Sequence, residues 1–336
     1  MKVAIIGAGM TGASAASSLV AMGIQVQVFD KGRGVGGRMS SKRLAETDYV
    51  DMGAQYFTAR DADFKDLVAK WQEVGVAALW HFTPSIFTGT LQASPDNEQR
   101  FVGVPTMQQP IKHLLADVDV TTSCRINNIS QDLSGLWLLT AEDGREFSGF
   151  SYVLVTTPPS QAAELLQSFP ELLPQLPTAI LQPCWAVTLT LSECSAVIDD
   201  ATENSTGNNA TGIFCQNGNI RWACQLQDKP GRQSTVRWLV HFSAEFTRAN
   251  LSATLAELTA YAKSELSQIL NYAIVVSDSI SHRWLYATVD AKQSPPGVLC
   301  SSNQQIWLAG DWSLGGRIEN AWLAGQFAAK RISAQL

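Results

Sequence analysis

The sequence predicts an α/β fold, with a parallel βαβ unit at its start and a second part of mixed α+β structure. Three observations predict it. An apolar strand at the start runs into a glycine fingerprint and a small-residue helix; another apolar strand near the end runs into Gly310-Asp311; and strand-like and helical patterns share the middle. The 336 residues are 46% hydrophobic and 16% charged, which provides for a large buried core.

The first βαβ unit begins with an apolar strand at residues 3–6. It runs into three glycines spaced as Gly7-x-Gly9-x-x-Gly12, and a helix of small residues follows. This order is typical of dinucleotide-binding folds. Gly7 makes the tight turn, Gly9 lets the backbone approach a pyrophosphate, and Gly12 allows close packing of the helix on the strand. The N–H groups at the start of the helix then face phosphate.

A second strand, Gln25–Phe29, ends at Asp30, which is placed to accept hydrogen bonds from an adenosine ribose. The segment Lys31-Gly-Arg-Gly-Val-Gly-Gly37-Arg38 follows directly. NAD needs no second glycine pair followed by an arginine. FAD is longer and needs donors further along its pyrophosphate, and Arg38 can supply a charge-assisted one. The sequence therefore predicts FAD as the cofactor.

Residues 51–57 indicate a short strand with a small Gly-Ala step. Such a step lets the backbone pass close to a flat ring, and we expect Gln55 and Tyr56 to follow at the ring itself.

The end of the chain carries a second cofactor segment. Residues 305–309 indicate a buried strand that runs into Gly310-Asp311, and a helix is expected at 319–332. We expect Asp311 to accept hydrogen bonds from cofactor hydroxyls, and the N–H groups at 318–320 to face the pyrimidine end of a flavin. One site built from both ends of the chain requires that the two ends meet.

The middle of the chain predicts a meander of strands that returns to the first sheet, followed by a mixed region. The expected meander strands are 119–122, 125–130, 135–141, 146–147 and 152–155. The mixed region has expected helices at 161–167 and 251–270, expected strands at 186–191 and 235–242, and a polar loop at 192–212.

Charge and cysteine usage exclude several classes of protein. With 24 Lys and Arg against 30 Asp and Glu, the net charge of −6 argues against binding to nucleic acid or to a membrane surface. No apolar run is long enough to span a membrane. The six cysteines form no C-x-x-C pair and suggest no metal site, so we expect reduced, mostly buried thiols in a cytoplasmic protein.

Six segments together resemble the flavin-containing amine-oxidase-like proteins, and among them most closely the renalases of the bacterial type. They are GAGMTG (7–12), DKGRGVGGRM (30–39), DMGAQYF (51–57), PTMQQPIKHLL (105–115), VLVTTPP (153–159) and AGDWSLGGRIENAWLAGQ (309–326). The resemblance implies a FAD-binding Rossmann-like domain of the amine-oxidase/glutathione-reductase type with a discontinuous α+β substrate domain. We expect the FAD-binding domain to comprise 1–60, 100–160 and 280–336, and the substrate domain 61–99 and 161–279.

The resemblance, carried over to matching positions, and the glycine fingerprint together predict which residues contact FAD and which contact the substrate. The predicted FAD contacts are Gly7, Gly9, Thr11, Gly12, Asp30, Lys31, Gly37, Arg38, Met39, Gln55, Tyr56, Val120, Gly310, Asp311, Ile318 and Glu319. The predicted substrate pocket residues are Tyr56, Trp222, His241, Trp284 and Asn320, with no acid or base catalyst among them. The match is less clear between 192 and 235.

The implied activity is oxidation of 2- or 6-dihydro isomers of NAD(P)H to NAD(P)+, by hydride transfer to flavin N5, with O2 reduced to H2O2. Two alternatives stay open. A flavin-containing amine oxidase would hold a neutral amine between two aromatic side chains, but no adjacent aromatic pair stands in the segment around Trp312 and Asn320. A non-catalytic nucleotide-binding or redox-sensing protein would keep the same glycine motifs.

Overall fold

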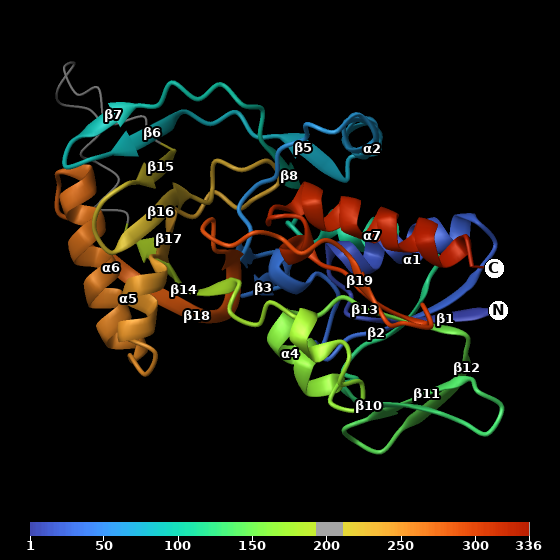
Figure 1. Ribbon diagram of the computed structural model, residues 1–336. Coiled ribbons are helices and arrows are strands. Elements are labelled where there is room, and N and C mark those ends of the chain that lie inside the picture. The colour runs from blue at the N-terminus through green and yellow to red at the C-terminus, as the bar shows by residue number, and fades with distance from the viewer. Residues whose placement is uncertain (193–210, 336) are drawn as a thin grey trace.

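The computed structural model describes residues 1–192 and 211–335, and the predicted polar loop at 192–212 lies almost wholly outside them. The first sheet has six strands in the order β19-β20-β13-β1-β2-β9, all parallel except β19. Their bounds are Leu299–Cys300, Ile306–Leu308, Tyr152–Val155, Lys2–Ile6, Gln25–Phe29 and Asp119–Thr121. Helices α1 (Met10–Ala21) and α7 (Ile318–Ser333) lie on one side of this sheet (Figure 1), and α3 (Gln109–Leu114) packs into the same buried cluster through Ile111.

Alternation along β1 explains why both faces of this sheet are covered. Val3 and Ile5 pack into the cluster that holds α1 and α7. Ala4 and Ile6 point the other way, into a cluster with a three-stranded antiparallel sheet of β10 (Ile126–Gln131), β11 (Trp137–Ala141) and β12 (Glu146–Phe150). A near-continuous apolar strand is what a parallel sheet buried on both faces requires.

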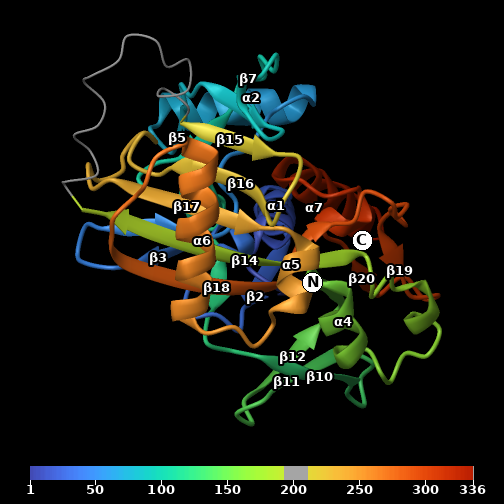
Figure 2. The same cartoon turned by 90° about the vertical axis from the view of Figure 1, so that its left-hand side faces the viewer.

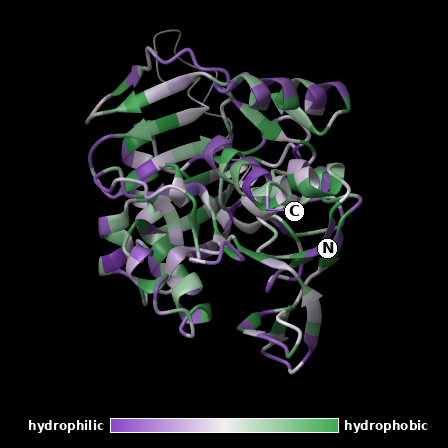
Figure 3. Cartoon of the chain, turned by 45° about the vertical axis from the view of Figure 1, so that its right-hand side comes forward, coloured by the Kyte–Doolittle hydropathy of each residue, from purple (hydrophilic) through white to green (hydrophobic). Residues whose placement is uncertain are grey.

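The second sheet has seven strands in the order β18-β14-β17-β16-β15-β6-β7. Their bounds are Val276–Val289, Leu181–Leu191, Arg237–Phe242, Ile220–Gln225, Gly212–Cys215, Pro84–Phe87 and Leu91–Ala93. Helices α5 (Ala244–Ala249) and α6 (Leu255–Leu270) lie in front of it in Figure 2. The buried positions of α6, Leu258, Ala262, Leu266 and Ile269, recur every three to four residues, and Figure 3 shows hydrophilic and hydrophobic residues alternating along the helices.

The other face of the second sheet turns toward the first sheet. Ala186, Cys224 and Leu239 belong to the same buried cluster as β1 and α1, whereas Val187 and Leu189 pack with α6. The other strands of the described residues, β3 (Ser41–Arg43), β4 (Tyr49–Asp51), β5 (Ala77–Leu79) and β8 (Phe101–Gly103), have three residues each, and the other α-helices are α2 (Ala62–Glu73) and α4 (Pro159–Leu165). Segments far apart in the sequence therefore meet between the two sheets.

The structure confirms the predicted α/β class and most elements, with two corrections. The strand expected at 51–57 ends at Asp51, because Met52–Tyr56 leaves the hairpin with β3 and makes other contacts. The helix expected from residue 251 begins at Leu255, where Thr254 and Glu257 form a capping box. The domain division remains a prediction, and its boundary at 280 falls inside β18, which pairs with β14 from Val276 to Val289.

Helices α1 and α7 pack against each other at a glycine. A Cβ atom added to Gly325 would lie 2.4 Å from the carbonyl oxygen of Thr11 and 2.8 Å from the Cβ of Ser14. Ser14 Oγ also donates to the carbonyl oxygen of Trp322 at 2.8 Å. This close approach brings the C-terminal helix onto the helix of the glycine fingerprint.

We expect Gly325→Ala to destabilise the protein by about 1–3 kcal/mol, because the clash with backbone outweighs the gain in helix propensity. The measurement is urea unfolding of the purified protein. Gly34→Ala is the matched control, because no chain atom lies within 4 Å of its added Cβ. Equal stability of the two variants would contradict the close helix packing.

Candidate functional site

The glycine fingerprint has the geometry expected of it at Gly7 and Gly12. Gly7 has φ +113°, and a Cβ there would lie 2.5 Å from Thr156 Oγ1. A Cβ on Gly12 would lie 1.9 Å from the carbonyl oxygen of Gly7. Thr156 Oγ1 lies 3.0 Å from the carbonyl oxygens of Ile6 and Gly7, so the residue that follows β13 supports the turn. The packing of the chain itself requires glycine at these two positions.

Gly9 differs, because no other chain atom lies within 4 Å of the place where its Cβ would be. It is the N-cap of α1, and no side chain caps the first N–H groups of that helix. The second glycine segment lies over it: Gly36 N–H donates to the carbonyl oxygen of Ala8 at 2.9 Å, and Gly37 approaches Gly9. Free helix N–H groups beside open space suit a phosphate group.

Asp30 holds this loop in place. Its two carboxylate oxygens accept from the N–H groups of Ala8 and Gly32, each at 2.7 Å. A carboxylate has further lone pairs, so these bonds leave capacity for the predicted ribose contact. Lys31 is exposed and donates to Gln161 at 3.1 Å, and Val120 pairs with Val28 at the β2–β9 edge.

Arg38 and Asp311 join the two predicted cofactor segments. The guanidinium binds both carboxylate oxygens, with Nη2 to Oδ1 at 2.5 Å and Nη1 to Oδ2 at 3.0 Å. Nη1 also donates to the carbonyl oxygen of Ala287 in β18. The Asp311 side chain is 9% exposed and that of Arg38 is 33% exposed. The Arg38–Asp311 pair thus brings the two predicted cofactor segments together. Arg38 is the predicted donor to the cofactor, and Asp311 is the predicted acceptor from its hydroxyls.

The carbonyl oxygen of Met52 accepts two hydrogen bonds from the second sheet. His241 Nε2 and Trp284 Nε1 each lie 3.0 Å from it. Because a carbonyl oxygen accepts and does not donate, the imidazole carries its proton on Nε2 and leaves Nδ1 as an acceptor. Burial lowers the pKa of His241 to about 4, against its usual 6.5. The histidine is therefore neutral at physiological pH.

The structure groups four of the five predicted pocket residues. His241 and Trp284 meet at Met52, and the rings of Tyr56 and Trp222 lie 5.6 Å apart between centroids. Trp222 also pairs with His241 across β16 and β17. Asn320 is engaged elsewhere, since its amide donates to the carbonyl oxygen of Leu314 at 2.6 Å.

Two predicted cofactor contacts use their side chains within the chain. Glu319 accepts from the N–H groups of Arg60 and Asp61, at 2.6 and 2.7 Å, and so supports the start of α2. Gln55 donates to the carbonyl oxygens of Asp51 and Gly53 and accepts from Lys229 Nζ at 2.7 Å. Because both side chains are already paired within the chain, a contact of Glu319 or Gln55 with the cofactor would be made by the backbone. These contacts remain predictions.

A buried charged cluster was missed from the sequence. Asp51 is 1% exposed, and its Oδ2 lies 2.7 Å from Arg232 Nη2 and 3.5 Å from Lys229 Nζ. Burial alone would raise the pKa of Asp51, but Lys229 and Arg232 lower it. Lys229 and Arg232 stand in a Lys-Pro-Gly-Arg turn, a composition typical of a solvated hairpin, so nothing local marked them as buried.

The described residues hold no cluster of metal-ligating side chains, and none of their helices has the length and apolar character of a membrane span. Their five cysteines are free. Burial raises the pKa of Cys224 to about 11 and that of Cys184 to about 12, so these thiols stay protonated.

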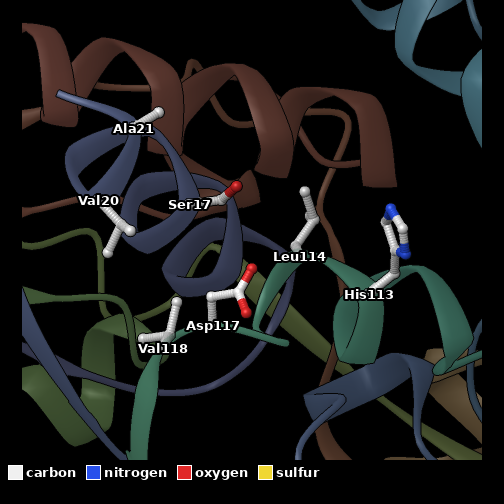
Figure 4. A pocket seen from close by; sticks show the side chains of 7 residues that line it. All are labelled: Ser17, Val20, Ala21, His113, Leu114, Asp117 and Val118. Atoms are coloured by element: carbon white, nitrogen blue, oxygen red, sulfur yellow. The ribbon is translucent and has the colours of Figure 1, made fainter. Parts of the chain in front are cut away.

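A surface groove in Figure 4 lies between α1 and α3, lined by Ser17, His113 and Asp117 among others, and contains none of the predicted site residues.

Comparison with known proteins decides the family. Residues 5–71 match the model of an NAD(P)-binding Rossmann-like domain. Residues 82–333 match the model described as flavin containing amine oxidoreductase, which covers most of the chain. The chain belongs to the flavin containing amine oxidoreductase family.

Individual relatives of this amine oxidoreductase-family chain match over short stretches. A probable zeta-carotene desaturase of Synechococcus elongatus is 36% identical over 90 residues, which are 27% of the chain and 18% of the desaturase. A 4,4'-diapophytoene desaturase of Staphylococcus aureus is 50% identical over 67 residues, or 20% of the chain and 13% of that protein. The matched stretches thus span less than a fifth of each desaturase.

A crystal structure from Exiguobacterium sp. 255-15, provisionally named a protoporphyrinogen oxidase, is similar with a TM-score of 0.75. The alignment covers 100% of the chain and 99% of that structure at 13% sequence identity. This likeness supports the fold over the whole chain.

Family membership indicates FAD as the cofactor, and the residues present fit it. The uncapped start of α1 and the open space at Gly9 suit the pyrophosphate, and Asp30 suits the ribose. The Arg38–Asp311 pair offers a donor and an acceptor at the meeting point of both cofactor segments.

We expect Gly9→Val to reduce FAD retention by tenfold or more while the stability of the apoprotein stays close to wild type. The side chain would enter space that no chain atom occupies and would displace phosphate from N–H donors, whose charge-assisted bonds contribute about 1.5–3 kcal/mol each. The flavin-to-protein absorbance ratio and apoprotein unfolding measure the two effects. Full FAD content in Gly9→Val would refute this placement.

We expect stability to fall between pH 6.5 and about 4 because of His241. Its folded pKa lies below its usual 6.5, so within this window the unfolded chain binds a proton that the folded chain does not. The free energy of unfolding should drop by about 2–3 kcal/mol across it. His241→Gln keeps a donor for Met52 but does not titrate, so its pH profile should be flatter by that amount; identical profiles would show that His241 does not contribute.

Proposed function

We propose that this chain is an FAD-dependent oxidase of renalase type. Its substrates would be the 2- or 6-dihydro isomers of NAD(P)H, which become NAD(P)+ while O2 is reduced to H2O2. The observation that carries the proposal is the group at Met52, where a neutral histidine and a tryptophan hold one carbonyl oxygen beside the Tyr56–Trp222 ring pair. The resemblance of the six sequence segments supports the same assignment.

The side chains around Met52 suit a reaction in which the substrate ring must be oriented and no proton has to be transferred. Bound FAD would supply the two-electron acceptor. A dihydropyridine that loses hydride gains aromaticity, so the protein mainly has to hold the ring in place and exclude water. Tyr56 and Trp222 offer ring surfaces for stacking, and His241 Nδ1 offers a hydrogen-bond acceptor without a charge.

The buried Lys229 favours a second candidate, the flavin-containing amine oxidase, because such enzymes can use a lysine near the flavin. Its Nζ donates to Gln55 at 2.7 Å and lies 3.5 Å from Asp51, so it is already partnered within the chain. An amine between two facing rings needs near-parallel planes, but Tyr56 and Trp222 meet edge to face with an interplanar angle of 61°. The ring nearly parallel to Tyr56, that of Phe82 at 28°, already shares the Arg100 guanidinium with it. This comparison favours the first candidate.

The enzyme is proposed to work in the cytoplasm, and the five free thiols of the described residues, two of them buried, support this.

We expect 6-dihydro-NAD to bleach the flavin of the purified protein rapidly under anaerobic conditions, and O2 to restore the colour with formation of H2O2. Benzylamine and spermine should leave the spectrum unchanged. Bleaching by an amine instead would favour the amine oxidase. A flavin that stays oxidised with every donor would favour a non-catalytic nucleotide-binding protein.

A further inference from the structure

A buried guanidinium lies among aromatic rings next to Tyr56. Arg100 is 4% exposed, and its Cζ lies 5.0 Å from the ring centroid of Tyr56, 4.8 Å from Phe82 and 5.6 Å from Phe214. Trp80 stacks on Phe82 at 4.6 Å, and Trp222 lies 4.6 Å from Phe214. We call these six residues the Arg100 cluster: Tyr56, Trp80, Phe82, Arg100, Phe214 and Trp222.

The Arg100 cluster contains hydrogen-bond donors without an acceptor. Arg100 Nε and Trp80 Nε1 are buried and have no hydrogen-bond partner within the described part of the chain, while the Arg100 guanidinium also interacts with the hydroxyl of Tyr56. The two residues are neighbours, because Trp80 N–H donates to the carbonyl oxygen of Arg100 at 2.8 Å. Trp222 Nε1 likewise lacks a conventional partner, with the weakly accepting thiol of Cys224 beside it. Buried donors are normally paired. Indole N–H groups without a partner also occur at Trp71, Trp137 and Trp312, and what distinguishes this cluster is that a guanidinium N–H joins two indole N–H groups beside partly exposed rings.

The charge of Arg100 is already balanced. Its Nη2 pairs with the carboxylate of Asp96, and Nη1 donates to the carbonyl oxygen of Glu98 at 2.9 Å. A second carboxylate would place another negative charge beside Asp96, and the nearby Lys229, whose Nζ lies 5.3 Å from the ring centroid of Trp80, is already bound to Asp51 and Gln55. An uncharged oxygen acceptor satisfies the free donors at no such cost. Tyr56, Phe82 and Phe214 are partly exposed, so one side of the cluster reaches the surface.

We propose that Arg100 and Trp80 are specificity-determining residues that bind an uncharged carbonyl oxygen carried on a flat ring, such as the carboxamide of nicotinamide. The aromatic faces stack against the ring, and the free N–H donors hold the oxygen. This inference rests on the proposed function, which supplies the nicotinamide ring. Trp80 and Arg100 would thereby select a carboxamide over a ring of the same shape without it.

The test measures binding to the FAD-loaded protein through the perturbation of flavin absorption, with three ring ligands: nicotinamide, 3-methylpyridine and nicotinate. We expect the wild type to bind nicotinamide about tenfold tighter than either other ligand. Trp80→Phe keeps the ring and removes the N–H, and Arg100→Lys keeps the charge and removes Nε. Each should reduce the preference over 3-methylpyridine by about three- to tenfold.

Trp137→Phe is the matched control, because Trp137 Nε1 is also buried without a partner but lies in the three-stranded sheet. It should bind all three ligands as the wild type does. An unchanged preference in both Trp80→Phe and Arg100→Lys would overturn the proposal, as would tighter binding of nicotinate than of nicotinamide. If one variant does not fold, the other decides.

These measurements need no turnover. A protein that fails to oxidise dihydronicotinamides but loses its carboxamide preference in the variants would support this subsite and refute the renalase-type reaction. A protein that oxidises dihydronicotinamides while the variants keep the wild-type carboxamide preference would support the renalase-type reaction and refute this subsite.

Discussion

The contact between the two ends of the chain determines the rest of this structure. Gly325 lets α7 lie against α1, and Arg38 binds both carboxylate oxygens of Asp311. The first contact is steric, since a Cβ would collide with backbone, and the second is a charge-assisted pair with fixed bidentate geometry. The glycine fingerprint and the Gly310-Asp311 turn thus lie together at the carboxyl ends of the parallel strands β1 and β20, which brings the two segments predicted to hold FAD to one place.

The segment after β4 connects this site to the second sheet. The carbonyl oxygen of Met52 accepts from His241 and Trp284, and Asp51 binds Arg232 and Lys229. Breaking a buried pair by removing one partner leaves an uncompensated charge, so such clusters tend to hold a single arrangement. Residues 52–56 leave the β-strand conformation where His241 and Trp284 of the second sheet bind the backbone of Met52, and Tyr56 follows in the aromatic group.

The proposed function and the proposed carboxamide subsite depend on different residues of the aromatic group around Tyr56. His241 and Trp284 are satisfied by Met52 and act by position, whereas Trp80 and Arg100 retain donors without acceptors. Tyr56 belongs to the Arg100 cluster, and Trp222, whose ring lies 5.6 Å from that of Tyr56, connects this cluster to His241 across β16 and β17. Burial raises the pKa of Tyr56, so its hydroxyl stays protonated and adds no charge. The aromatic group thus combines ring surfaces, one neutral imidazole and a guanidinium whose charge is balanced.

The sequence by itself determined the α/β class, the fingerprint from Gly7 to Gly12, the strand that ends at Asp30 and the helix after Gly310-Asp311, because these follow from local apolar periodicity and from glycine geometry. Tertiary structure alone decided which side chains meet. Lys229 stands in a turn of polar composition and is nevertheless buried against Asp51, and Glu319 supports α2 through its side chain. Such pairings join residues more than 170 positions apart, and no local pattern encodes which distant partner satisfies a buried charge or N–H group.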